Sequence, residues 1–193
     1  MTKEIATLPP IEVLAPATPT SPRTGEPPRP AALWISSVLL HLASAALAGA
    51  YGWHWWQAAH SDTYGASARL IGWLEPEPGK WLSLLLEGIF ALALVLAAGA
   101  CSTIGYQSWI GRRWTRPASF AALTLTAGFA AILNHAAFIG LGLAVAGAAL
   151  LWLPSLSTYH SHWEQLRAAR QGGYRRPESI HYGPLARYHR GRT

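Results

Sequence analysis

The sequence predicts an all-α integral membrane protein: a bundle of four transmembrane helices with both termini in the cytoplasm. Two observations lead to this fold class, namely long apolar runs and a one-sided distribution of basic residues. Of the 193 residues, 51% are hydrophobic and only 12% are charged. A helix of about 20 apolar residues spans a bilayer core of about 30 Å, and lipid forces such a run to be helical. We therefore divide the chain into a Pro-rich arm (1–31), a four-span domain (32–156) and a basic tail with a short helix (157–193).

The arm, residues 1–31, is rich in proline and threonine and shows little apolar periodicity. This composition favours extended, polyproline-like or unfolded chain. We expect the arm to have no fold of its own and to become ordered only against other protein. A signal peptide is not expected, because no apolar segment follows the start within the usual distance.

The first two spans are predicted at 32–56 and 80–110. Tryptophans and tyrosines gather at the ends of both runs, where amphipathic rings prefer the headgroup level. Between the runs, 66–74 is expected to form a short helix on the membrane surface, because the sequence EPEPGK that follows contains two prolines. Apart from Lys80 at its start, the second run carries one charged residue, Glu87.

The next 40 residues, 117–156, carry no charge. A single helix of that length would measure about 60 Å, twice the bilayer core. We therefore predict two antiparallel helices, 118–134 and 137–155, with the turn at the polar pair Asn134–His135 and with Pro154 ending the fourth span. In the tail, residues 161–164 match a helix capping box, so a short soluble helix is expected to begin there.

The basic residues fix the orientation of these four spans. With four spans, thirteen lysines and arginines share the side of both termini and only two lie opposite, which places the termini in the cytoplasm. A multi-pass protein of a bacterial plasma membrane is expected, with anionic lipids of the cytoplasmic leaflet rather than nucleic acid near the basic tail. The termini side holds Lys3, Arg23, Arg29, Arg112, Arg113, Arg116, Arg167, Arg170, Arg175, Arg176, Arg187, Arg190 and Arg192, and the other side Arg69 and Lys80.

Glu87 is the sharpest chemical feature, about 9 Å of helix below the outer interface. Ionisable groups inside membranes are costly and face protein or water rather than lipid. One interpretation is a proton or cation site in which Glu87 pairs with His135 at the outer turn. The other is structural: Glu87 faces the turn around Asn134 and His135, or a partner subunit, and supports assembly.

Histidines raise the question of a cofactor. His41 lies deep in the first span, but no second ligand for a haem occurs at matching depth, so we expect it to bond to Ser37, Ser44 or a partner helix. His54, His60 and His135 are all expected at the outer face, but no cysteine and no close carboxylate except Asp62 would complete a metal site there. We therefore expect no cofactor and no metal in this chain.

Small residues recur at spacing four on the first and fourth spans. Such rows let helices approach closely in lipid, either within the bundle or against another chain, and the wide small-residue surface of the fourth span favours a partner. The rows are Gly140, Ala144 and Ala148; Gly142 and Ala146; and Ala45 and Gly49.

A small four-span chain, rich in alanine and tryptophan with a proline-rich arm, resembles the supernumerary subunits of actinobacterial respiratory complexes. The nearest of these is the accessory subunit of the cytochrome bcc–oxidase supercomplex. The resemblance implies a non-catalytic subunit that packs on cytochrome b or oxidase helices and has no cofactor of its own. The sequence contains none of the common nucleotide-binding, zinc-protease or serine-hydrolase motifs, so an enzyme is not expected. Two alternatives stay open: a small proton-linked transporter using Glu87 and His135, and an actinomycete plasmid-transfer membrane protein whose basic tail meets DNA or a translocase.

Overall fold

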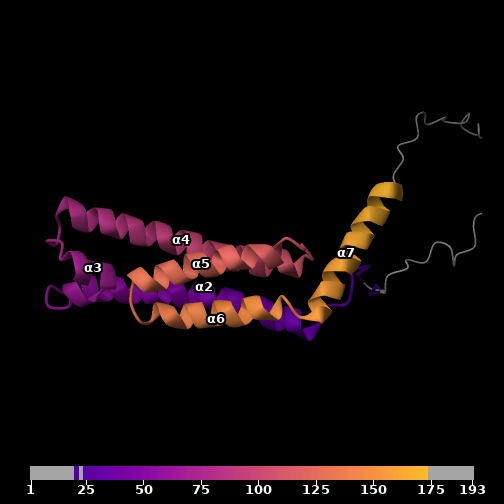
Figure 1. Cartoon of the computed structure of the whole chain (residues 1–193), viewed down its shortest axis with the longest axis horizontal. Coiled ribbons are helices and arrows are strands. Elements are labelled where there is room, and N and C mark those ends of the chain that lie inside the picture. The colour runs from indigo at the N-terminus through magenta and orange to yellow at the C-terminus, as the bar shows by residue number, and fades with distance from the viewer. Residues whose placement is uncertain (1–19, 22–23, 174–193) are drawn as a thin grey trace, which may run out of the picture.

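The computed structural model describes residues 20–21 and 24–173. That part of the chain is helical and has no strand (Figure 1). The predictions for the arm before residue 20 and for the tail beyond residue 173 lie outside the described residues. The elements are α2 (Ala31–Ala58), the 3₁₀ turn η1 (Tyr64–Ala66), α3 (Arg69–Leu74), α4 (Trp81–Trp109), α5 (Thr115–Ile132), α6 (Ala137–Leu150) and α7 (Pro154–Gly173).

Four helices lie side by side in a bundle, and α7 leans away from one end of it (Figure 1). Helix α2 packs on α4 and α6, and α5 packs on the same two helices. We call the end with α7 the α7 end, and the other the connector end, after residues 59–80. Helix α2 begins at the α7 end, so both ends of the described chain lie at that end of the bundle.

The four helices predicted for the bundle agree with the structure within three residues at every boundary except the last. The turn between α5 and α6 falls at residues 133–136, as the Asn134–His135 pair predicted. The short helix of the connector is confirmed as α3. It ends at Glu75, which adopts a left-handed conformation (φ 44°) just before Pro76.

The prediction for the fourth span was wrong at its far end. Helix α6 stops at Leu150, and the chain resumes as α7 from Pro154 at an angle of 65°. Proline is well placed as the first residue of α7, where its missing N–H has no partner to lose. The tail helix therefore begins at Pro154 and not at the capping box. Ser161 lies inside it and donates to the Thr158 carbonyl (2.8 Å).

Large apolar side chains cover the outside of the bundle, while alanines, leucines and two phenylalanines fill much of its inside. One buried cluster surrounds Phe90 and Phe129 toward the connector end, and another surrounds Leu40 and Cys101 toward the α7 end. So large an exposed apolar surface is unusual for a soluble monomer. It includes Trp34, Val38 and Leu42 on α2, Leu84, Leu92 and Val95 on α4, Phe120 and Leu125 on α5, and Phe138, Ile139 and Val145 on α6.

Helices α2 and α4 are long and apolar enough to cross a membrane, with 28 and 29 residues. Counting the bent pair α6–α7 as one span gives a third. Helix α5 has 18 residues and α6 has 14, which correspond to about 27 Å and 21 Å of helix. Both fall short of a bilayer core of about 30 Å.

Candidate functional site

Glu87 of α4 pairs with His54 of α2 near the connector end. The His54 Nε2 atom lies 3.0 and 3.1 Å from the two carboxylate oxygens of Glu87. The imidazole is fully buried, whereas the Glu87 side chain keeps 20% of its surface exposed. Nε2–H donates to the carboxylate, and a charge-assisted bond of this kind is stronger than one between neutral groups. The pair therefore links the two longest helices of the bundle.

Within the chain, the predicted pairing of Glu87 with His135 or with the turn around Asn134 was wrong, because its carboxylate meets His54. His135 is exposed, and Asn134 is buried with its side-chain amide donating to the Ala50 carbonyl of α2 (3.0 Å). Asn134 thus fastens the α5–α6 turn to α2, and no contact joins it to Glu87. We expected His54 at the outer face and did not predict its burial, although Leu40, Leu47 and His54 repeat at seven-residue spacing on the buried face of α2. That spacing was the available signal.

Two aromatic rings and a buried hydroxyl lie near the pair. The His54 ring stacks on Tyr51 (5.9 Å between ring centroids) and meets the edge of Phe90 (5.2 Å). Its Nδ1 atom is buried without a hydrogen-bond partner among the described residues. The Tyr64 hydroxyl is also buried there. Burial raises its pKa, a nearby Ser83 hydroxyl lowers it, and the Glu87 carboxylate raises it again.

This arrangement suits a structural bond better than a metal site. With its hydrogen on Nε2, the imidazole of His54 leaves Nδ1 as an acceptor. Among the described residues, no three His, Cys, Asp or Glu side chains lie together in a way that could hold a metal ion. His60 turns to its own helix instead, with Nδ1 2.8 Å from the Trp56 carbonyl.

His41 lies on the outside of the bundle, toward the α7 end. Its Nδ1 donates to the backbone carbonyl of Ser37 (2.7 Å), one of the partners that we expected. The ring covers Gly105 of α4, where a Cβ atom would lie 2.9 Å from it. His41 also lines an apolar surface groove of about 410 Å³ with Trp34 and Trp109. The glycine therefore provides the space in which the imidazole lies against α4.

The rows of small residues divide between the two surfaces of α6. Gly140, Ala144 and Ala148 are buried, and Gly140 lies so close to Leu47 of α2 that a Cβ would approach within 2.7 Å. Close packing within the chain therefore uses this row, contrary to our preference for a partner. The other rows are exposed, with Gly142 and Ala146 on α6 and Ala45 and Gly49 on α2.

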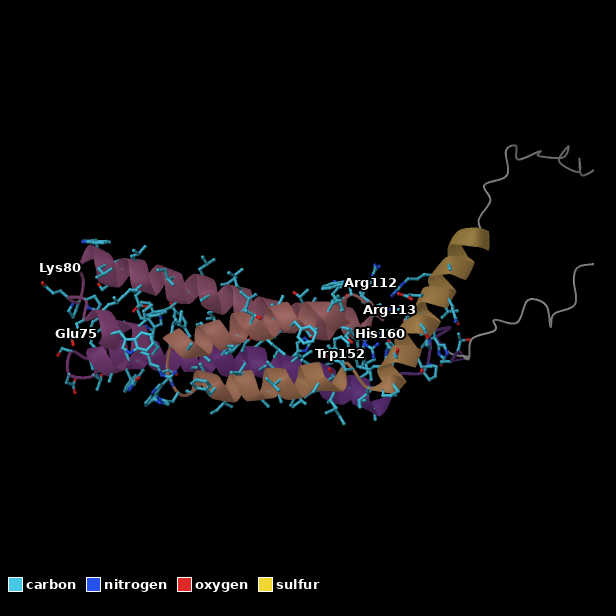
Figure 2. The ribbon with its side chains drawn as sticks, in the orientation of Figure 1. Glu75, Lys80, Arg112, Arg113, Trp152 and His160 are labelled. Atoms are coloured by element: carbon cyan, nitrogen blue, oxygen red, sulfur yellow. The ribbon has the colours of Figure 1, made fainter. Side chains whose placement is uncertain are left out.

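The arginines of the α4–α5 loop lie at the α7 end with Trp152 and His160, opposite Glu75 and Lys80 (Figure 2). Arg116 closes the end of α6: its guanidinium donates to the carbonyls of Leu151 (2.8 Å) and Leu153 (3.2 Å) and to the Ser157 hydroxyl (3.1 Å). The last carbonyls of a helix have no partner within it, so Arg116 supplies one. Arg116 therefore makes specific hydrogen bonds, whereas the sequence predicted only that its charge helps to orient the bundle in the membrane.

Arg112 and Arg113 remain largely exposed. Arg113 lies 3.4 Å from Glu164 of α7, with 65% and 47% of the two side chains exposed. Exposed ion pairs of this kind contribute little. Arg112 makes no side-chain hydrogen bond within the part of the chain that the structure describes.

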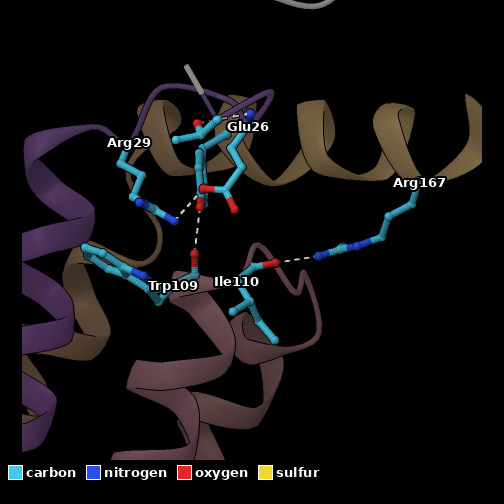
Figure 3. Close-up of polar contacts among 7 residues, drawn as sticks. Glu26, Arg29, Trp109, Ile110 and Arg167 are labelled. Carbon is cyan, nitrogen blue, oxygen red and sulfur yellow. Dashed lines mark hydrogen bonds and ion pairs between the residues drawn. The ribbon is translucent and has the colours of Figure 1, made fainter. Parts of the chain in front are cut away.

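Helix α7 closes the end of α4 in the same way (Figure 3). The Tyr159 hydroxyl donates to the Trp109 carbonyl (2.7 Å). Arg167 donates to the carbonyls of Ile110 and Gly111. In the same view Arg29 forms an ion pair with Glu26 (2.6 Å), and its guanidinium lies over the Trp109 ring. The α7 end is thus held together by polar contacts among segments distant in sequence.

Comparison of the chain with protein-family models, with curated proteins and with solved structures finds no match. Function is therefore argued from the chain's own geometry.

Proposed function

We propose that the chain is a four-span protein of a bacterial plasma membrane with both termini in the cytoplasm. Support comes from the exposed apolar residues on all four bundle helices, including the short α5 and α6. Among the residues whose side chains the structure describes, the charges also separate: five arginines lie at the α7 end and two basic residues at the connector end. By the positive-inside rule the α7 end faces the cytoplasm. The five are Arg29, Arg112, Arg113, Arg116 and Arg167; the two are Arg69 and Lys80.

Within the membrane we propose a non-catalytic, accessory role in a larger complex, of the kind found in respiratory electron-transfer supercomplexes. The observation that carries this proposal is how the polar groups are used. His54, Glu87 and Asn134 tie α2 to its neighbours, while Arg116 and Arg167 close helix ends. Each of these groups holds one element against another. Cytochrome b or oxidase subunits are the partners that the resemblance suggests, and anionic lipids would contact the cytoplasmic face.

Purification of the tagged chain from its native membranes in a mild detergent tests the accessory role. We expect other membrane subunits to co-purify at fixed stoichiometry, together with haem absorbance that the isolated chain lacks. Gly142→Leu on α6 and Gly88→Leu on α4 are matched variants, because a Cβ at either position meets open space within the chain. Loss of the partners in one variant only would locate the contact surface. Recovery of the chain alone under these conditions would reject the proposal.

The Glu87–His54 pair also favours a second candidate, a small proton-linked transporter, because ionisable pairs inside membranes are typical of proton pathways. Reconstituted vesicles distinguish the two. A pH-driven flux that is lost in Glu87→Gln, while the variant still folds and assembles, would support transport. The accessory role predicts that neither the wild-type chain nor the variant carries such a flux.

A further inference from the structure

A surface groove opens at the α7 end, on the side where α5 begins and α6 ends. Its volume is about 430 Å³, and it is lined by Arg113, Trp114, Arg116, Pro117 and Trp152. Among these residues, Arg116 is held by its bonds to the end of α6, and its guanidinium lies 5.6 Å from the centroid of the Trp152 ring. The groove is therefore built on a positioned cation.

A second depression adjoins it and shares Arg113 and Trp114. It adds Arg112, Arg167 and the single carboxylate Glu164. The two depressions together hold four arginines against one glutamate. The crowding of positive charge also affects the pKa values of Arg167, in the second depression, and of His160 nearby. Burial first, and then the Arg112 charge, lower the pKa of Arg167; burial first, and then Arg116, lower that of His160. An anion placed here would relieve this repulsion.

One wall of the groove continues along the outside of the bundle as apolar surface. The rings of Trp152 and Phe120 lie 5.5 Å apart, and 50% and 60% of these residues are exposed. Trp114, at the rim, is 47% exposed. Arginines above tryptophans, with a phenylalanine below, follow the order of a bilayer from headgroup to acyl chain.

We propose that the groove and its adjoining depression together bind one anionic phospholipid of the cytoplasmic leaflet. The phosphate lies between Arg112 and Arg113 above the Trp114 rim, and an acyl chain runs along Trp152 and Phe120. A soluble phosphate or an acidic peptide would use the arginines but leave the apolar wall uncovered, which is why a lipid fits better. The inference rests on the proposed orientation of the bundle in the membrane and not on the accessory role.

The test uses the full chain, purified in detergent and stripped of lipid. Native mass spectrometry measures binding of phosphatidylglycerol and of phosphatidylcholine with identical acyl chains. The double variant Arg112→Gln/Arg113→Gln removes two exposed charges at the site. Its matched control, Arg69→Gln/Lys80→Gln, removes two charges at the opposite end. Glu164→Gln removes the competing carboxylate, and circular dichroism checks that each variant folds.

We expect the wild-type chain to prefer phosphatidylglycerol. The site variant should lose roughly fivefold in affinity for each arginine removed, the change expected from one basic residue near anionic lipid. The control should bind like the wild type, and Glu164→Gln should bind more tightly. Equal losses in both double variants would mean unspecific charge attraction and would overturn the site. So would equal binding of the two lipids, or displacement of the lipid by millimolar inorganic phosphate.

Failure here is distinguishable from failure of the proposals above. The lipid measurement uses the isolated chain, so it does not depend on whether partners co-purify. The orientation is tested separately by labelling at Ser61. External labelling there, combined with no lipid preference, would reject the groove alone.

Discussion

At the scale of single residues, several buried polar groups of the described chain bond to a partner on another element. His54 is the clearest case, because a fully buried imidazole reaches from α2 to the Glu87 carboxylate of α4. Glycine makes a comparable contribution by leaving space: Gly105 makes room for the His41 ring, and Gly111 for the Trp163 ring. Two substitutions measure these effects.

Glu87→Leu should destabilise the chain by about 1–3 kcal/mol, because the buried His54 Nε2–H loses its acceptor. Glu87→Gln should cost much less, since the amide oxygen can still accept that proton. Thermal unfolding in detergent, with Glu77→Leu as the exposed control, checks the difference. Equal melting temperatures for Glu87→Leu and Glu77→Leu would show that the bond to His54 contributes nothing.

Gly111→Ala should be more harmful than Gly79→Ala. Both glycines have positive φ angles, 72° and 76°, so both variants incur a backbone cost of about 1–2 kcal/mol. Only at Gly111 would the new Cβ overlap the Trp163 ring, whereas Gly79 faces open space. The difference between the two melting temperatures isolates the contact with α7. Identical shifts would mean that Trp163 moves aside freely.

At the scale of elements, α7 packs against the end of the bundle and bonds to the carbonyls at the end of α4. It supplies Tyr159 and Arg167 to the end of α4, while Arg116 of α5 closes the end of α6. The carbonyls of both helix ends would otherwise need water, and the two arginines also complement the negative ends of the helix dipoles. Docking of α7 therefore depends on groups from three helices.

Stability of the α7 contact should fall at acidic pH through His160. This histidine is buried, with Nε2 3.4 Å from the Ser108 hydroxyl. Burial, followed by the Arg116 charge, lowers its pKa from the usual value of 6.5. Its folded-state pKa lies below its unfolded one, so the stabilisation is complete above pH 6.5 and is lost as the pH falls through the lowered pKa.

Melting temperatures between pH 7.5 and about 4.5 check this prediction. His160→Gln should flatten the acid limb of the curve, whereas His60→Gln, an exposed histidine at the connector end, should leave it unchanged. An unaltered acid limb in His160→Gln would assign the pH dependence to another group.

At the scale of the whole molecule, the outside of the bundle is apolar around its middle and charged at its ends. The α7 end carries arginines, and the connector end carries Asp62, Glu75 and Glu77 beside its two basic residues. This distribution suits a bilayer, and the positive-inside rule predicts from it the direction proposed above.

Single cysteines test that direction in a Cys101→Ser background. An impermeant thiol reagent applied to intact cells should label Ser61→Cys at the connector end. Thr24→Cys and Ser155→Cys, both exposed at the α7 end, should react only after the cells are opened. The reverse pattern would invert the bundle, and labelling of Ser61 and Thr24 from the same side would exclude a four-helix crossing.

The sequence alone determined the helices and the connections between them. Apolar runs mark α2 and α4 within three residues, and Asn134 with His135 locates the α5–α6 turn, because these signals are local. The break after Leu150 was missed. Proline can end one helix or begin another. Pro154 by itself therefore does not show whether it ends the fourth span or begins the tail helix.

Only the tertiary structure decided which polar groups meet. The sequence marked Glu87, Asn134 and Arg116 as candidates, but their partners lie between 33 and 84 residues away along the chain. Such pairs depend on the rotation of each helix about its axis, which α2 sets by burying Leu40, Leu47 and His54 on one face. The sequence pattern gives the position of a residue along its helix. Which polar group it meets on another helix depends on how all four helices pack together.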